Sequence, residues 1–254
     1  MTIREQMISA LGRSKKTLGE SVKLVIKFFQ SCSNHDGGFH GRGKKSDLYY
    51  TAFGLEALLA LGETISQNTA KFLRQFQQNL PDDLVHLSSL IRCYANIHKN
   101  DIDQKFKNIL AEELENYRSD DGGFAQEKKP RNGTIYGCFL TLFAYQDLRL
   151  QIPDAAKVIN FIKSLQKSNG GYANSESIKV SATPATAAAM MILNHLDEPI
   201  AEETKSWLAN QCTDKGGFRA IPLAPVADLL STATALHALA VTGADIEKDR
   251  KSVV

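Results

Sequence analysis

One short pattern, two glycines followed by an aromatic residue, recurs four times along the chain. The copies are Gly37-Gly38-Phe39, Gly122-Gly123-Phe124, Gly170-Gly171-Tyr172 and Gly216-Gly217-Phe218. The last three copies are spaced by one regular interval, and the first interval is close to two such units. One copy therefore looks degenerate, and the stretch 79–83 falls where its shortened loop should be. A fixed period of this size is the sequence signature of a repeat architecture.

Two kinds of helical pattern accompany each triplet. The stretch before a triplet carries a one-sided apolar stripe, such as Val22, Ile26 and Phe29 before the first copy. About ten residues after each triplet comes a stretch that is apolar nearly all round and rich in Ala, Thr, Ser and Leu. These second stretches are 47–61, 84–97, 134–147, 183–196 and 228–242. A helix that is apolar on every side is expected to be buried on every side.

The alternation predicts an all-α fold of about five helical hairpins, with an inner and an outer helix layer, closed or nearly closed as an α/α toroid. An open solenoid of the same hairpins is the structural alternative. The glycines are expected to supply a positive φ where the outer helix ends, and the aromatic residue to fill the gap between hairpins. We interpret residues 1–254 as a single domain, with an extra helix in 1–18 and a C-terminal tail at 244–254. Asp47 and Asp228 are expected to place carboxylates at the N-termini of inner helices, where the helix dipole favours them, and Thr183 is predicted to be a capping hydroxyl before Pro184.

The composition of the whole chain does not point to any class of macromolecular partner. A net charge of +2 argues for neither nucleic acid nor an anionic membrane surface. The sequence lacks an apolar run long enough to cross a bilayer and an N-terminal apolar region typical of a signal peptide. The scattered cysteines form no CxxC motif and are interpreted as reduced structural thiols of a cytoplasmic protein; they are Cys32, Cys93, Cys138 and Cys212.

Three segments resemble the repeats of protein prenyltransferase β subunits. Residues 37–62, GGFHGRGKKSDLYYTAFGLEALLALG, are similar to the family pattern of a glycine pair, a Gly-Arg, a basic residue and an Asp that opens an inner helix. Residues 228–239 repeat that theme, and residues 131–138, RNGTIYGC, resemble the segment His-x-Gly-x-x-Tyr-x-Cys. The resemblance extends over about 22–243. It is specific for the superfamily, which also includes terpene cyclases, and weak for any one activity.

The resemblance implies a ligand and a set of site residues. In the family, an apolar centre lined by aromatic residues binds farnesyl or geranylgeranyl diphosphate, and a zinc ion activates a cysteine thiolate of the acceptor. Carried onto this chain, Asp47 matches the zinc Asp, and Tyr50 matches either the diphosphate tyrosine or the zinc His. The diphosphate contacts would come from basic residues, namely Arg42, Lys44, Lys45 and Arg131.

The zinc ligands are incomplete in the sequence. The family has Cys two residues after the Asp, whereas this chain has Tyr49 after Asp47 and Leu230 after Asp228. A catalytic zinc needs three protein ligands, so we expect neither zinc nor another resident cofactor. A bound diphosphate could still carry Mg²⁺.

Each candidate residue also has a structural interpretation. Arg42, Lys44 and Lys45 could be a diphosphate site or simply a solvated loop. The aromatic candidates could line a ligand cavity or pack between hairpins; they are Tyr49, Tyr50, Phe53, Tyr136 and Phe139.

Three functions remain open. The first is a prenyltransferase-like protein that binds an isoprenoid diphosphate or another lipid, with or without transfer of the prenyl group. The second is a non-catalytic lipid- or protein-binding toroid. The third is a small terpene cyclase, although the chain lacks the Asp-x-Asp-Asp motif and Glu56 is the only acidic residue that we place inside an inner helix. Five hairpins, where the family ring has about six, also leave a side for a helical partner subunit or a second copy.

Overall fold

The computed structural model describes residues 1–97 and 102–244, and nearly all of its regular structure is helical. The elements within these ranges are α1 (Ile3–Leu18), α2 (Ser21–Ser31), α3 (Leu48–Ala60), α4 (Asn68–Arg74), α5 (Leu84–Ile97), α6 (Gln104–Glu115), α7 (Ile135–Leu148), α8 (Ala155–Ser164), α9 (Thr183–His195), α10 (Glu202–Ala209), β1 (Phe218–Arg219), β2 (Ala227–Asp228) and α11 (Leu229–Val241). The two short strands pair antiparallel. Residues 245–254 of the predicted C-terminal tail lie outside the described residues.

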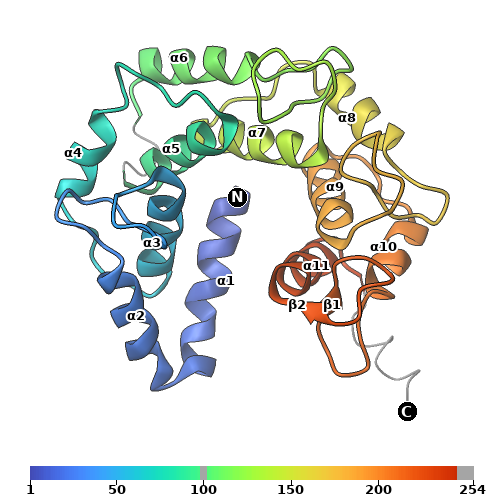
Figure 1. The fold of residues 1–254 in the computed structure, drawn as a ribbon, viewed down its shortest axis with the longest axis horizontal. Coiled ribbons are helices and arrows are strands. Elements are labelled where there is room, and N and C mark those ends of the chain that lie inside the picture. The colour runs from blue at the N-terminus through green and yellow to red at the C-terminus, as the bar shows by residue number, and fades with distance from the viewer. Residues whose placement is uncertain (98–101, 245–254) are drawn as a thin grey trace. The chain divides into compact units, whose positions relative to one another are not determined.

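The five apolar stretches of the sequence correspond to α3, α5, α7, α9 and α11, each within two residues of its expected bounds (Figure 1). A shorter or more amphipathic helix precedes each of them. The stretch 79–83 carries no triplet, and α5 starts directly after it. No described helix combines the length and apolar character needed to cross a bilayer.

The chain divides into two compact units. The first comprises 1–116 and 140–152, and the second comprises 117–139 and 153–254, so that α7 contributes its N-terminal part to one and its C-terminal part to the other. In the first unit α3 packs most extensively on α5, and in the second α9 packs most extensively on α11. The interpretation of residues 1–254 as a single domain stays a prediction.

The glycine pair has two different structural roles. The first glycine of each triplet has a positive φ, for example 92° at Gly37 and 89° at Gly122, as the turn after an outer helix requires. In the second and third triplets the second glycine makes room for an aromatic ring of the next outer helix, whereas Gly217 of the fourth triplet has a positive φ of 79° itself. A Cβ at Gly123 would lie 2.6 Å from the ring of Phe161, and one at Gly171 would lie 2.6 Å from Trp207.

After three of the four triplets, a threonine of the following inner helix accepts a hydrogen bond from the aromatic residue of the triplet. The backbone N–H of Phe39 donates to Thr51 Oγ1 at 2.9 Å, and the corresponding distances are 2.8 Å for Tyr172 to Thr186 and 2.9 Å for Phe218 to Thr232. After the second triplet this place is taken by Cys138. Burial raises the pKa of the Cys138 thiol to about 12, so its role is packing rather than reactivity.

The carboxylates expected at two inner-helix N-termini are confirmed, and both also act as helix caps. Asp47 caps α3 and Asp228 caps α11, each by accepting backbone N–H groups of the first turn. The predicted cap at Thr183 is wrong, because α9 already begins there and Ala182 is the capping residue. The Thr183 hydroxyl instead donates to the backbone oxygen of Arg219. It thereby ties together two neighbouring loops.

The expectation that inner helices are buried on every side is wrong for α3 and α11. Tyr49 and Phe53 of α3 and Leu229 and Leu230 of α11 are exposed. Both groups lie near the N-terminal ends of their helices, where a neighbouring helix does not cover them. The apolar composition of these helices therefore does not predict that they are buried. A helix face that contacts a ligand or a partner protein has the same composition as a face that packs in the core.

In the first unit, α1 lies on the side of α3 and α5 opposite to α4 and α6 (Figure 1). Its N-terminal turn has a capping box between Thr2 and Glu5. Arg4 of this turn is buried, and its Nε donates to Asp147 Oδ1 at 2.8 Å while Nη1 donates to Asn96 Oδ1 at 3.0 Å. Helix α1 is therefore fixed to the C-terminal ends of α5 and α7 by buried charged hydrogen bonds.

Candidate functional site

Asp47 stands at the junction between the basic loop 40–46 and helix α3. Its Oδ1 accepts the N–H groups of Tyr49 and Tyr50 at 2.9 and 3.2 Å. Its second oxygen, Oδ2, lies 2.9 Å from Nε2 of His86. The carboxylate thus caps its own helix and also contacts the first turn of α5.

His86 is a site residue that sequence reasoning missed. Its Nδ1 lies 2.7 Å from Asp83 Oδ2, so the imidazole bridges Asp83 and Asp47. The sequence separation of Asp47 and His86 gave no signal of this contact, and only the packing of α5 on α3 creates it. Partial burial disfavours the imidazolium, but hydrogen bonds to Asp47 and Asp83 outweigh burial and raise the pKa of His86.

The donors at this place do not fit a catalytic zinc ion. Asp47 and His86 could supply an oxygen and a nitrogen, but Asp83 contacts the other nitrogen of the imidazole and does not converge on the same point. The position two residues after Asp47, where the family has a cysteine ligand, is occupied by Tyr49. Among the described residues, no three His, Cys, Asp or Glu side chains are placed to hold a metal ion. A catalytic zinc site needs three protein ligands, and the side chains described around Asp47 offer two, Asp47 and His86.

The Asp83–His86–Asp47 bridge predicts a measurable titration. Because the folded pKa of His86 is raised, the bridge stabilises the folded protein at pH values below the ordinary pKa of histidine. That stabilisation is lost as the pH rises through the folded value. Replacing Asp47→Asn should lower the pKa of His86, as measured by NMR titration of the imidazole protons. An unchanged pKa of His86 in this variant would contradict the bridge.

The predicted aromatic residues of α3 form one exposed cluster. The ring centroids of Tyr49 and Phe53 are 4.8 Å apart and those of Tyr49 and Tyr50 are 5.5 Å apart, both with edge-to-face geometry. Each side chain is more than a third exposed. Tyr50 also covers Gly41, where a Cβ would lie 2.1 Å from the tyrosine ring. The cluster is thus connected to the basic loop, and its rings keep an open apolar side.

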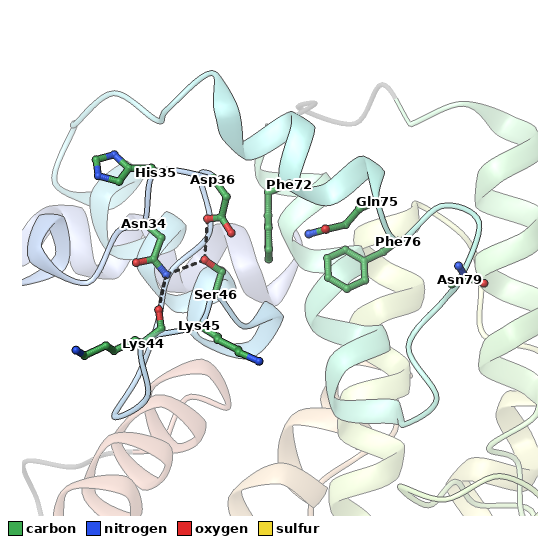
Figure 2. A pocket seen from close by; sticks show the side chains of 10 residues that line it. All are labelled: Asn34, His35, Asp36, Lys44, Lys45, Ser46, Phe72, Gln75, Phe76 and Asn79. Carbon is green, nitrogen blue, oxygen red and sulfur yellow. Dashed lines mark hydrogen bonds between the residues drawn. The ribbon is translucent and has the colours of Figure 1, made fainter.

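The basic loop lies at one wall of an open pocket of about 730 Å³ (Figure 2). Lys44 and Lys45 line it together with Ser46 on one side, and Phe72 and Phe76 of the α4 region lie opposite. Arg42 is exposed in the same loop but does not line this pocket. Asn34 shapes the loop by donating from Nδ2 to the backbone oxygen of Lys44 at 3.1 Å. The pocket therefore brings cations and aromatic rings together beside an outer helix, not among the aromatic residues of α3.

The remaining predicted residues belong to the second unit. Arg131 is exposed in the loop before α7, and Phe139 is half-buried within α7. The backbone N–H of Tyr136 donates to Asn174 Oδ1 at 3.0 Å, and its side chain is partly exposed at the start of α7. Tyr136 therefore has an accessible ring, as a ligand-lining residue would need.

The inner helices carry buried carboxylates, but these are paired. Glu56 of α3 accepts from Arg92 of α5, with 2.8 Å between Oε2 and Nη2. Asp147 of α7 is a second buried carboxylate, so the interpretation of Glu56 as the only acidic residue inside an inner helix is wrong. Burial raises the pKa of Asp147 to about 6 although Arg4 lowers it. A proton donor to an alkene would have to be a strong acid facing the substrate. Two carboxylates paired with guanidinium groups do not supply one.

Comparison with known proteins identifies the family. The model of the prenyltransferase alpha-alpha toroid domain matches residues 6–86, 87–183 and 175–254. The chain therefore belongs to the prenyltransferase alpha-alpha toroid family, and its all-α, α/α-toroid fold class is confirmed. No curated protein matches the sequence.

Solved structures of several activities share this fold. A protein geranylgeranyltransferase-I of Candida albicans complexed with GGPP is 16% identical over 87% of this chain and 78% of its own, with a TM-score of 0.71. The type II terpene cyclase MstE of Scytonema is 16% identical over 93% and 76%, with a TM-score of 0.61. A sugar epimerase from a ruminal bacterium is 12% identical over 96% and 87%, with a TM-score of 0.56. At such identities these matches establish the fold alone.

Proposed function

We propose that this protein binds an isoprenoid diphosphate, with the exposed aromatic cluster of α3 against the hydrocarbon chain and the basic loop against the diphosphate. The observation that carries the proposal is the adjacency of Tyr49, Tyr50 and Phe53 to the loop that bears Arg42, Lys44 and Lys45. Apolar rings and unpaired cations on one short segment match a ligand that is hydrocarbon at one end and doubly anionic at the other.

Several features of the first unit support this assignment. Arg42, Lys44 and Lys45 are exposed, and no described ion pair engages them. The loop leads directly into the N-terminus of α3, where the helix dipole also favours anions. Geranylgeranyltransferase-I, which shares the fold, was solved with GGPP, a ligand of the same chemical class.

Binding is a better-supported role than zinc-dependent transfer. Transfer to a thiol breaks the C1–O bond of the prenyl diphosphate, forms a C1–S bond and releases diphosphate with the electron pair. In this chain the cationic loop would stabilise the departing diphosphate, but the donors around Asp47 do not provide a zinc ion to activate the thiol. Asp47 is accordingly proposed to hold His86 and the loop in place, and Tyr50 to contact the ligand beside Gly41.

The proposal is tested by equilibrium binding of radiolabelled farnesyl and geranylgeranyl diphosphates. The double variant Tyr49→Ala/Phe53→Ala should weaken binding by about tenfold or more, because two rings no longer cover the chain. Phe28→Ala is the matched control, since Phe28 is an exposed aromatic residue of α2 outside the site.

A second pair of variants separates the charge contribution from the apolar one. Arg42→Ala/Lys45→Ala should weaken the diphosphates about tenfold and leave binding of the uncharged prenyl alcohol unchanged. Lys27→Ala/Lys71→Ala removes two exposed charges elsewhere and should have no effect. If wild-type protein binds neither diphosphate, the proposal is wrong. If only the aromatic variant matters, the protein is a lipid-binding toroid without diphosphate recognition.

A further inference from the structure

The loop that joins β1 and β2 differs from the other loops at the same place in the repeat. Each triplet is followed by such a loop before its inner helix begins. The first two loops, 40–46 and 125–133, each carry three basic residues, whereas 220–227 reads AIPLAPVA and has no charge. The third loop, 173–181, is mixed and contains Ile178-Lys179-Val180.

The large apolar side chains of this loop face solvent. Leu223 is 91% exposed and Val226 is 69% exposed, and Leu229 at the start of α11 is 86% exposed. Ile178 and Val180 of the third loop are also exposed. The loop 220–227 projects from the β1–β2 ladder (Figure 1). Such a concentration of exposed aliphatic residues marks an interaction surface.

The exposure of the aliphatic side chains in loop 220–227 is not explained by the lack of a neighbouring repeat. The first loop is followed along the chain by further repeats, yet its residues 42–45 are exposed. The second loop is also followed by further repeats and is exposed at 126–129. The position is thus a solvent-facing one throughout the repeat series, and at the fourth copy it carries leucine, isoleucine and valine in place of lysine and arginine.

Hydrogen bonds connect three of these loops into one rim of the second unit. Thr183, at the end of the third loop, donates its backbone N–H to Ala220 O at 2.8 Å. Asn174, at its start, accepts the N–H of Ile135 at 2.9 Å, directly after the second loop. The rim therefore carries exposed aliphatic residues at one end and a basic loop at the other. Its basic residues are Lys128, Lys129 and Arg131 in the second loop and Lys179 in the third, and they outnumber the acidic Glu127 and Glu176 of the same loops.

We propose that this rim, formed by loops 125–133, 173–181 and 220–227, docks on the surface of an anionic lipid bilayer. Aliphatic side chains on a projecting loop can enter the acyl boundary, and the neighbouring cations contact anionic headgroups. This pairing of exposed aliphatic side chains with cations on one rim matches the acyl chains and anionic headgroups of a bilayer, and it favours lipid over a protein partner. The inference does not depend on the proposed ligand of α3.

The test is co-sedimentation of the full chain with vesicles of phosphatidylcholine alone or mixed with phosphatidylglycerol. Wild-type protein should sediment with the anionic vesicles, less so as salt is added. Leu223→Ser/Val226→Ser should reduce the bound fraction about tenfold, because two inserted side chains are lost. Lys128→Glu/Lys129→Glu should reduce binding to anionic vesicles in particular.

Leu24→Ser/Phe28→Ser is the matched control, because both side chains are exposed on α2 of the first unit and belong to none of the three loops of the rim. Circular dichroism checks that each variant is folded. The proposal is overturned if wild-type protein stays in the supernatant with both kinds of vesicle, or if the α2 control loses as much binding as the loop variant. A dimer in size-exclusion chromatography that Leu223→Ser/Val226→Ser disperses, without vesicle binding, would assign the rim to a second copy instead.

Discussion

The variant Arg4→Ala should lose about 3 kcal/mol of unfolding free energy at pH 8. Arg4 and Asp147 are both almost completely buried, and removal of the guanidinium leaves a carboxylate with no compensating charge. The Asp147 carboxylate must then stay ionised without its hydrogen-bonded partner or take up a proton, and both cost free energy. Asn96 loses its donor at the same time. Urea unfolding followed by circular dichroism measures the loss.

The same variant should be less harmful at pH 5. Burial raises the pKa of Asp147 to about 6, above its ordinary value of 3.8, so folding favours the protonated carboxyl. The contribution of this group to stability is therefore complete below the ordinary pKa and declines as the pH rises through 6. Below that value Asp147 is already largely protonated and needs Arg4 less. A loss that is equal at both pH values would contradict this account.

Two further variants distinguish charge pairing from packing. Arg4→Ala/Asp147→Asn removes both charges and should recover a large part of the lost stability, because a buried pair is costly mainly when it is broken. Lys23→Ala removes a solvent-exposed ion pair with Glu20 and should leave stability nearly unchanged. If the double variant is as unstable as Arg4→Ala, the loss arises from packing of the arginine stem.

The variant Gly137→Ala should lose about 3 kcal/mol, although alanine is the better helix former. Helix propensity alone predicts a gain of about 1 kcal/mol for this change inside α7. A Cβ at Gly137, however, would lie 2.2 Å from the backbone oxygen of Phe124 and 2.8 Å from the Cα of Ala125. Backbone atoms cannot rotate away as a side chain would, so the loop after the second triplet has to shift.

Gly43→Ala is the control for this prediction. A Cβ at Gly43 meets no atom within 4 Å, and its φ is not positive, so alanine should be tolerated. Urea unfolding of the two variants side by side gives the comparison. Gly137→Ala with wild-type or higher stability would mean that helix propensity outweighs the close approach of the two backbones.

Local patterns were sufficient to predict the helices. The five apolar stretches, the outer helices before the triplets and the positive φ at Gly37 all follow from periodicity and turn chemistry, which act within a few residues. The family resemblance rested on the same local repeats and was confirmed. The role of the second glycine was not predictable, because the ring that fills its place, such as Phe161 beside Gly123, belongs to the next repeat.

The site depended more strongly on tertiary contacts. The sequence placed Asp47 at the start of an inner helix and Tyr49 where a zinc ligand would be needed, but it did not reveal His86, which reaches Asp47 only because α5 packs on α3. It also did not reveal that Arg4 of the N-terminal helix pairs with Asp147. Helix spans follow from short-range backbone and side-chain preferences that any segment expresses alone. Which charged groups meet depends on how the helices pack, and that is decided by the burial of apolar surface contributed by the whole unit.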